Sequence, residues 1–144
     1  KVLAQGAIHP DVTVSSSGAI TLNFTSSVVQ VGLGYTHRYH SFKLDYGGAV
    51  GTAQGATKRI SGVKVGLLDA LTLKIGPSSS QLDTYDFREV DDAMDTAVPL
   101  FTGEQRVELD DDWKRDPRIV IESDDPAPFT MTALIPTIKT NDAS

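Results

Sequence analysis

Residues 71–75 read Leu71-Thr72-Leu73-Lys74-Ile75, and apolar and polar side chains alternate through them without a break. Alternate side chains of a strand point to the same face of a sheet, so this stretch predicts a strand with one buried face and one solvated face. The sequence Gly76-Pro77-Ser78 follows directly, and its composition is typical of a turn. A short strand that ends in a turn favours an antiparallel sheet.

The same two-residue period recurs along much of the chain. It is clearest in residues 20–24, 63–65, 107–109 and 119–121, and further strands are expected in residues 27–33, 35–44 and 129–140. Pro136 interrupts the last segment, which therefore fits an edge strand or a bulge, because proline lacks the N–H that a central strand donates. Short strands bounded by Gly, Asp or Pro predict an all-β fold, an antiparallel β-sandwich or barrel-like domain with long loops.

Two segments depart from this pattern. Residues 45–57 contain four glycines among small side chains, which predicts a flexible connection or an exposed hairpin tip. Residues 91–97 have the only helical pattern, and Pro99 would end it, so at most one or two helical turns are expected. The length of 144 residues is that of one ordinary domain, and we predict a single β domain over residues 1–144.

The composition excludes several classes of protein. The chain has no cysteine, which rules out disulfides and thiolate metal sites. Its apolar runs are strand-length, far below the ~20 residues of a membrane-spanning helix, so no membrane segment is expected. Because the chain begins with Lys1 rather than methionine and shows no signal segment, we expect it to be a fragment or processed product of a longer protein.

The net charge of −6 is unevenly distributed. Residues 1–82 hold seven Lys/Arg against three Asp, whereas residues 83–125 hold five against fifteen Asp/Glu. This acidic block indicates either a solvated face or a surface that repels nucleic acid, because phosphate binding depends on clustered Lys and Arg. Both interpretations disfavour a protein that grips DNA.

The acidic block contains the only tryptophan of the chain. It lies in the sequence Asp110-Asp111-Asp112-Trp113-Lys114-Arg115. A lone aromatic ring among charges can stack on a sugar, anchor a protein interface, or fold over a sheet edge as a lid on the core. We predict a partner interface formed by Trp113, Arg115, Asp110, Asp111 and Asp112.

No pattern in the sequence indicates catalysis. His37 and His40 are three residues apart on an expected strand, so their rings point to opposite faces and do not easily share a metal. His9 precedes Pro10 in an expected turn, where an exposed ring is the default. The aspartate clusters lack the central Gly and distal Glu of a calcium-binding loop. Incidental binding of a calcium ion to these surface carboxylates is left as an alternative. The serines lie in turn clusters without a nucleophile elbow. We therefore predict no enzyme activity, no metal site and no cofactor.

Several short motifs follow one another in a fixed order. They are Val2-Leu3-Ala4 with Gly6 and Pro10, Gly18-Ala19-Ile20-Thr21-Leu22, Val29-Gln30-Val31-Gly32-Leu33-Gly34-Tyr35, Lys58-Arg59-Ile60, Pro99-Leu100-Phe101-Thr102-Gly103, Trp113, Arg118-Ile119-Val120-Ile121, Asp124-Asp125-Pro126-Ala127-Pro128 and Ile135-Pro136. This order resembles the C-terminal portion of the tail tubular protein B, or nozzle, family of short-tailed (podovirus-type) bacteriophages. The chain departs from the family at Gly34, where a proline is common.

The resemblance implies a structural role in the virion. Such a subunit, made in the host bacterial cytoplasm, would join other full-length copies in a ring of six and contact neighbouring tail adaptor proteins. DNA would pass through the ring during ejection without specific binding. Because a negative surface would keep the DNA sliding, our hypothesis from the charge distribution is that part of the acidic block lines or rims the channel. The alternative function is a carbohydrate-binding β-sandwich that recognises host surface glycans, with Trp113, Tyr35 or Tyr39 as stacking platforms.

Overall fold

The computed structural model describes residues 1–48 and 51–141, which form strands, turns and loops without a helix. The strands are β1 (Val2–Ala4), β2 (Ala7–His9), β3 (Val29–Val31), β4 (His37–His40), β5 (Gly47–Gly48), β6 (Gly51–Thr52), β7 (Thr57–Ala70), β8 (Thr72–Ser78), β9 (Gln81–Asp86), β10 (Phe101–Glu108), β11 (Val120–Ser123) and β12 (Thr130–Asn141). The predicted all-β class is confirmed. Residues 91–97, where helical turns were expected, form ordinary turns.

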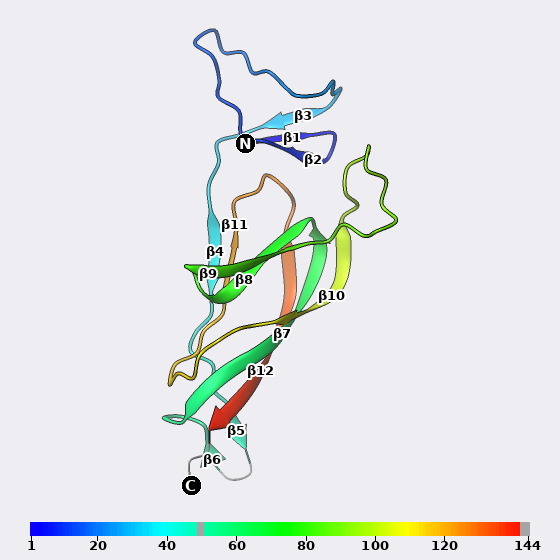
Figure 1. The fold of residues 1–144 in the computed structure, drawn as a ribbon. Helices are drawn as coiled ribbons and strands as arrows, with labels where there is room; N and C mark the ends of the chain where they lie inside the picture. Colours follow the sequence, from blue (N-terminus) through cyan, green and yellow to red (C-terminus); the bar gives the residue numbers. More distant parts are fainter. Residues whose placement is uncertain (49–50, 142–144) are drawn as a thin grey trace.

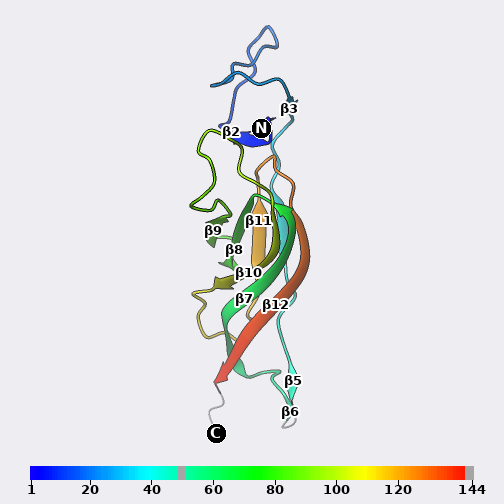
Figure 2. The same ribbon diagram turned by 90° about the vertical axis from the view of Figure 1, so that its right-hand side faces the viewer.

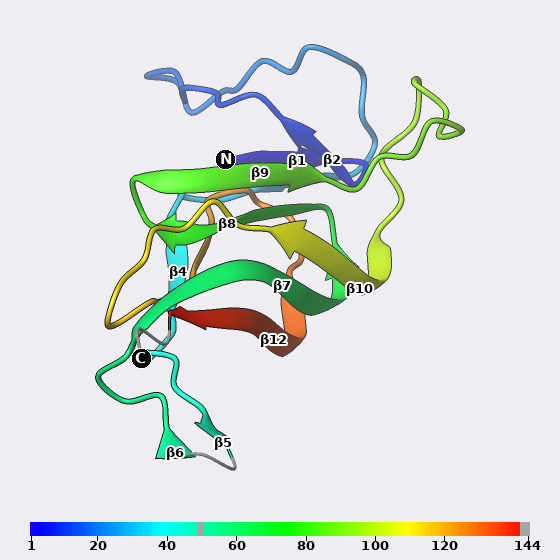
Figure 3. The ribbon, with the colours of Figure 1, turned by 60° about the horizontal axis from the view of Figure 1, so that its bottom comes forward.

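Two antiparallel sheets form the body of the molecule. One has the strand order β10-β7-β12 and the other has the order β4-β11-β8-β9. Figure 3 shows β8 and β9 on one side and β7 and β12 on the other. Strand β12 lies at an edge, and Pro136 faces Val63 of β7 one residue before a register shift. This arrangement confirms the expectation that the proline-containing segment is an edge strand or carries a bulge.

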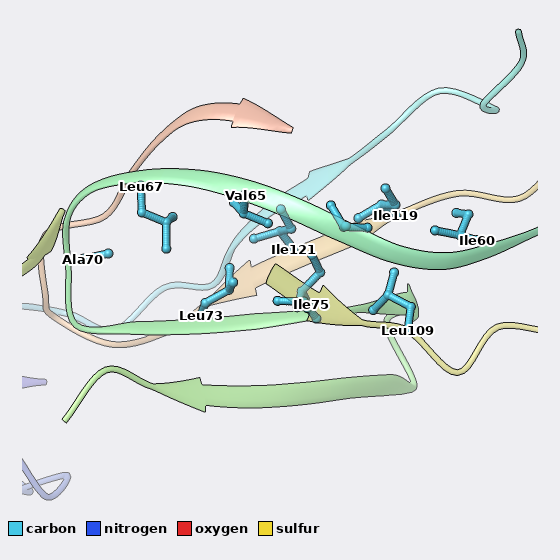
Figure 4. Close-up of a cluster of buried hydrophobic side chains, with 11 residues drawn as sticks. Ile60, Val65, Leu67, Ala70, Leu73, Ile75, Leu109, Ile119 and Ile121 are labelled. Atoms are coloured by element: carbon cyan, nitrogen blue, oxygen red, sulfur yellow. The ribbon is translucent and has the colours of Figure 1, made fainter. Parts of the chain in front are cut away.

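The hydrophobic core lies between these two sheets. Figure 4 shows side chains of β7 meeting those of β8 and of the segment that contains β11. The core comprises Ile60, Val63, Val65, Leu67, Ala70, Leu73, Ile75, Val107, Leu109, Ile119 and Ile121. Leu73 and Ile75 are fully buried, as the alternation of residues 71–75 predicts. Each buried side chain of this size contributes about 1.5–3 kcal/mol to folding, which makes the sandwich the stable part of the chain.

The chain passes from one sheet to the other between β7 and β8. Asp69 has a left-handed backbone, with φ of 53°, and Thr102 of β10 holds it through a hydrogen bond to the Asp69 N–H at 3.1 Å. This corner lets two strands that are adjacent in sequence face each other across the core, as Figure 4 shows.

A third sheet and a small hairpin lie at opposite ends of the molecule, which is elongated (Figures 1 and 2). The third sheet has the order β2-β1-β3. Its hairpin turns at Gln5 and Gly6, which both have positive φ, as a type I′ turn requires. At the other end, β5 pairs with β6, so the glycine-rich segment forms a hairpin. Residues 49–50 of that segment lie outside the described residues.

One strand prediction was wrong. Residues 20–24 alternate in sequence but form no strand, because no neighbouring segment pairs with them. Their polar contacts go instead to a side chain, since the Asn23 N–H donates to Nε2 of His9 at 2.9 Å. Phe24 also packs its ring near the His9 ring, with the centroids 5.7 Å apart. The alternation in residues 20–24 therefore reflects the partial burial of this segment against β2, and the segment is not a strand of any sheet.

Candidate interaction surfaces

The acidic tryptophan loop, residues 109–116, is fixed along β7. Lys58 and Lys114 form an isolated antiparallel bridge in which each N–H donates to the other carbonyl, at 2.7 and 2.8 Å. The Leu109 N–H also reaches the carbonyl of Ser61 at 3.4 Å. The loop therefore continues the edge of the β10-β7-β12 sheet after β10 ends, and its side chains have defined positions.

Asp111 points inward from this loop, and only 3 % of the residue is exposed. Its carboxylate accepts a hydrogen bond from the Ile60 N–H at 3.4 Å and one from Nζ of Lys114 at 2.8 Å. It thus supplies an acceptor at a point where β7 has no partner strand on that side. Asp110 and Asp112 are exposed on either side of it. Of the three aspartates predicted for a partner interface, Asp111 has no surface to offer.

Trp113 lies half-exposed on the same loop, with 46 % of its surface open to solvent. The Arg59 guanidinium carbon lies 5.8 Å from the centre of its ring, within the range of a cation–π contact. One face of the indole is therefore associated with β7. Arg115 is exposed nearby along the chain. Trp113, Arg115, Asp110 and Asp112 remain candidates for contact with a partner.

A basic groove lies where the end of this loop meets β4, and the sequence analysis did not predict it. The groove has a volume of about 260 Å³, and its lining comprises Arg38, His40, Pro77, Ser78, Ser79, Lys114, Asp116, Arg118 and Val120. Arg118 is exposed and makes no ion pair with any described residue. Arg38 pairs with Glu122 at 2.6 Å, as an ion pair rather than a well-aligned hydrogen bond. The lining is positive in a chain whose net charge is −6.

Phe42 extends this surface. Residues 41–44 follow β4 beside residues 117–119, because the Ser41 N–H donates to the carbonyl of Ile119 and the Leu44 N–H donates to that of Pro117. Phe42 lies just beyond the end of β4, and it is exposed like His40 whereas Ser41 between them is buried. Its exposed fraction of 90 % is unusual for a phenylalanine.

A projecting loop between β9 and β10, residues 87–100, has the opposite character. At its base, the rings of Phe87 and Phe101 stack 4.6 Å apart. Inside it, Nη2 of Arg88 donates to the carbonyls of Ala93 and Thr96 at 2.8 and 3.3 Å. These contacts give the loop a defined shape. Its exposed residues include the carboxylates Glu89, Asp91 and Asp95 and the apolar side chains Val90 and Met94.

A chain of ion pairs connects the N-terminal sheet to the sandwich. Nζ of Lys1 lies 2.9 Å from Asp11 and 3.9 Å from Asp124, and Asp124 also binds Nζ of Lys74. The hydrogen bond from Lys74 holds the pKa of Asp124 below its usual value, and the same contact raises the pKa of Lys74. Asp125 accepts a hydrogen bond from Thr72 at 3.0 Å. These contacts give the carboxylates of the β11–β12 loop a structural role.

The three histidines occupy different environments. His9 was expected to be exposed, and this expectation was wrong, because it is 2 % exposed and its ring bonds to Asn23 and Pro10. His37 packs near Tyr35, whereas His40 lines the basic groove. Within residues 1–48 and 51–141, no group of three or more His, Asp or Glu side chains is arranged to hold a metal ion.

The sequence comparisons identify no relatives. No protein-family model matches the chain, and no curated protein matches it. Among the described residues there is also no helix that is long and apolar enough to cross a membrane.

Proposed function

We propose that this chain is a structural domain of a bacteriophage tail nozzle, a subunit of the tube through which DNA leaves the particle. The proposal is carried by the order of motifs that resembles the nozzle family, spread from Val2 to Pro136. The fold is compatible with it, because an elongated molecule built around a two-sheet sandwich is a stiff building element.

The distribution of charge also supports this role. Loops rich in carboxylates, at residues 87–100 and 109–116, extend from the sandwich. A negative surface beside a DNA conduit repels phosphates and keeps the polymer mobile. We therefore expect no binding of duplex DNA to the purified chain even at low ionic strength, where phosphate contacts are strongest.

The direct test is detection of the chain in virus particles. An antibody raised against residues 1–141 is applied to purified particles of the phage that encodes the protein, and bound gold is located by electron microscopy. We expect label at the tail, below the head. Particles that lack the protein by mass spectrometry, yet remain infectious, would refute the proposal.

A second function is favoured by one observation, the half-exposed indole of Trp113. Asp112 precedes Trp113 in the loop and Arg115 follows it by two residues, and both are exposed. An aromatic ring with polar groups close to it in the sequence suits the binding of a sugar. Binding to a glycan array that is lost in Trp113→Ala and kept in Tyr46→Ala would support a carbohydrate-binding module. Equal binding by both variants would count against it.

A further inference from the structure

We propose that the projecting loop of one copy docks onto the basic groove of a second copy of this chain. The loop contributes residues 87–100 with Val90 and Met94 at its surface. The groove contributes Arg38, His40 and Arg118, with Phe42 beside them. The role of this contact in a tail rests on the proposed function, which it deepens by naming the neighbour.

Charge complementarity selects a second copy as the occupant. The loop presents the exposed carboxylates Glu89, Asp91 and Asp95. The groove presents Arg118, which makes no ion pair with any described residue, and Arg38, whose one partner is Glu122, against the single carboxylate Asp116 in its lining. In a chain with a net charge of −6, most pairs of surfaces repel each other. Loop against loop or groove against groove places like charges together, whereas loop against groove places opposite charges together.

Both surfaces also expose apolar groups at the place where the charges match. Val90 and Met94 have exposed fractions of 102 and 83 %, and Phe42 on the other surface has 90 %. An interface needs a desolvated apolar centre with charged groups around it, because exposed ion pairs alone contribute little. The pairing of Val90 and Met94 with Phe42 supplies that centre.

The two surfaces lie on opposite sides of the molecule. Figures 1 and 3 both show the β9–β10 loop projecting on one side, and β4 with residues 109–117 on the other. A contact between unlike surfaces is head-to-tail, and repetition of it produces a closed ring or an open filament rather than a two-fold dimer. The loop needs little ordering on binding, because Arg88 and the Phe87–Phe101 stack already hold it.

The experiment uses the 144-residue chain and two variants that each lose one surface. The groove variant carries Phe42→Ser and Arg118→Glu, and the loop variant carries Val90→Ser and Asp91→Lys. Lys139→Glu and Glu104→Lys make the same changes of net charge on β12 and β10 and serve as controls. Sedimentation velocity is measured over a concentration series, and circular dichroism verifies that each variant is folded.

The wild type is expected to self-associate reversibly, with a dissociation constant in the micromolar to millimolar range because the contact is small. Association should be strong at about 0.01 M ionic strength and largely lost at about 1 M. Each surface variant alone should associate at least about tenfold more weakly, and the controls should match the wild type. An equal mixture of the two surface variants should form dimers and nothing larger, because only one intact loop–groove pair remains.

A folded wild type that stays monomeric at low ionic strength would overturn the inference. So would association that persists unchanged in the two surface variants, or a mixture of them that forms no dimer. These results concern the contact alone, since labelling of virus particles tests the tail function independently. A chain that is found in tails but does not self-associate refutes the contact and leaves the proposed function standing.

Discussion

Removal of the Asp111 carboxylate should weaken the attachment of the acidic tryptophan loop to β7 and destabilise the domain, although the backbone bridge between Lys58 and Lys114 remains. In Asp111→Ala the buried Ile60 N–H loses its acceptor, and an unsatisfied buried donor costs about 1–3 kcal/mol. The ion pair with Lys114 is also lost, but that side chain is 41 % exposed and water can solvate it, so this loss adds less than about 1 kcal/mol. The desolvation cost of the carboxylate is recovered. We expect a net loss of about 2 kcal/mol.

Urea denaturation followed by Trp113 fluorescence measures this loss, because Trp113 is the only tryptophan. With a slope of about 2 kcal/mol per molar urea, the midpoint should fall by about 1 M. Asp111→Asn keeps an oxygen for the Ile60 N–H and should lose about half as much. Asp112→Ala, a change at the exposed neighbour, should stay within about 0.5 kcal/mol of wild type. Equal midpoints for Asp111→Ala and Asp112→Ala would refute the structural role of Asp111.

Two further changes test the four-stranded sheet. A Cβ added at Gly76 would overlap the backbone carbonyl of Gln81 in β9. Gly76→Ala should therefore lower the free energy of unfolding by about 3 kcal/mol or more, measured by thermal or urea denaturation. Gly32→Ala is the control and should be near neutral, because a Cβ at Gly32 would contact no other atom within 4 Å. Because the folded-state pKa of Asp124 lies below 3.8, its stabilisation is present above that pH and is lost as pH falls through the folded pKa. Lys74→Ala should therefore reduce the loss of stability as the pH falls below about 5. The change should be less than about 1 kcal/mol because Asp124 is 41 % exposed, and an unchanged pH dependence of stability in acid would contradict the assignment.

The strands that form the core could be predicted because burial leaves a direct pattern in the sequence. Residues 63–65 and 71–75 alternate, and the structure buries their apolar members between the two sheets. The packing of these two strands against each other across the core, which depends on the corner at Asp69, could not be predicted in the same way. It depends on a left-handed residue and on the Thr102 contact from β10, which is remote in sequence.

The candidate interface could be predicted only in part. The exposure of Trp113 agrees with its polar neighbours, but the inward turn of Asp111 follows from the missing partner of the Ile60 N–H, which no local pattern reveals. For the groove, the sequence does contain a pattern, because Arg38, His40 and Phe42 follow one another at intervals of two residues, although β4 ends at His40. Those residues become part of a surface with Arg118 only because residues 41–44 run beside residues 117–119, through the hydrogen bonds of Ser41 to Ile119 and of Leu44 to Pro117.

The sheet edges favour side-chain docking over strand addition as the way in which copies of this chain meet. An open edge strand pairs with another chain unless proline, charge or a bulge prevents it. On β12, Pro136 and two register shifts interrupt the ladder, and Lys139 follows. On β10, the charged residues Glu104, Arg106 and Glu108 alternate along the strand, and a register shift separates Phe101 from the rest. Because both edges of this sheet resist backbone pairing, assembly through it would have to use projecting side chains. Exposed apolar side chains lie beside charges of opposite sign on the β9–β10 loop and next to β4, at Val90, Met94 and Phe42.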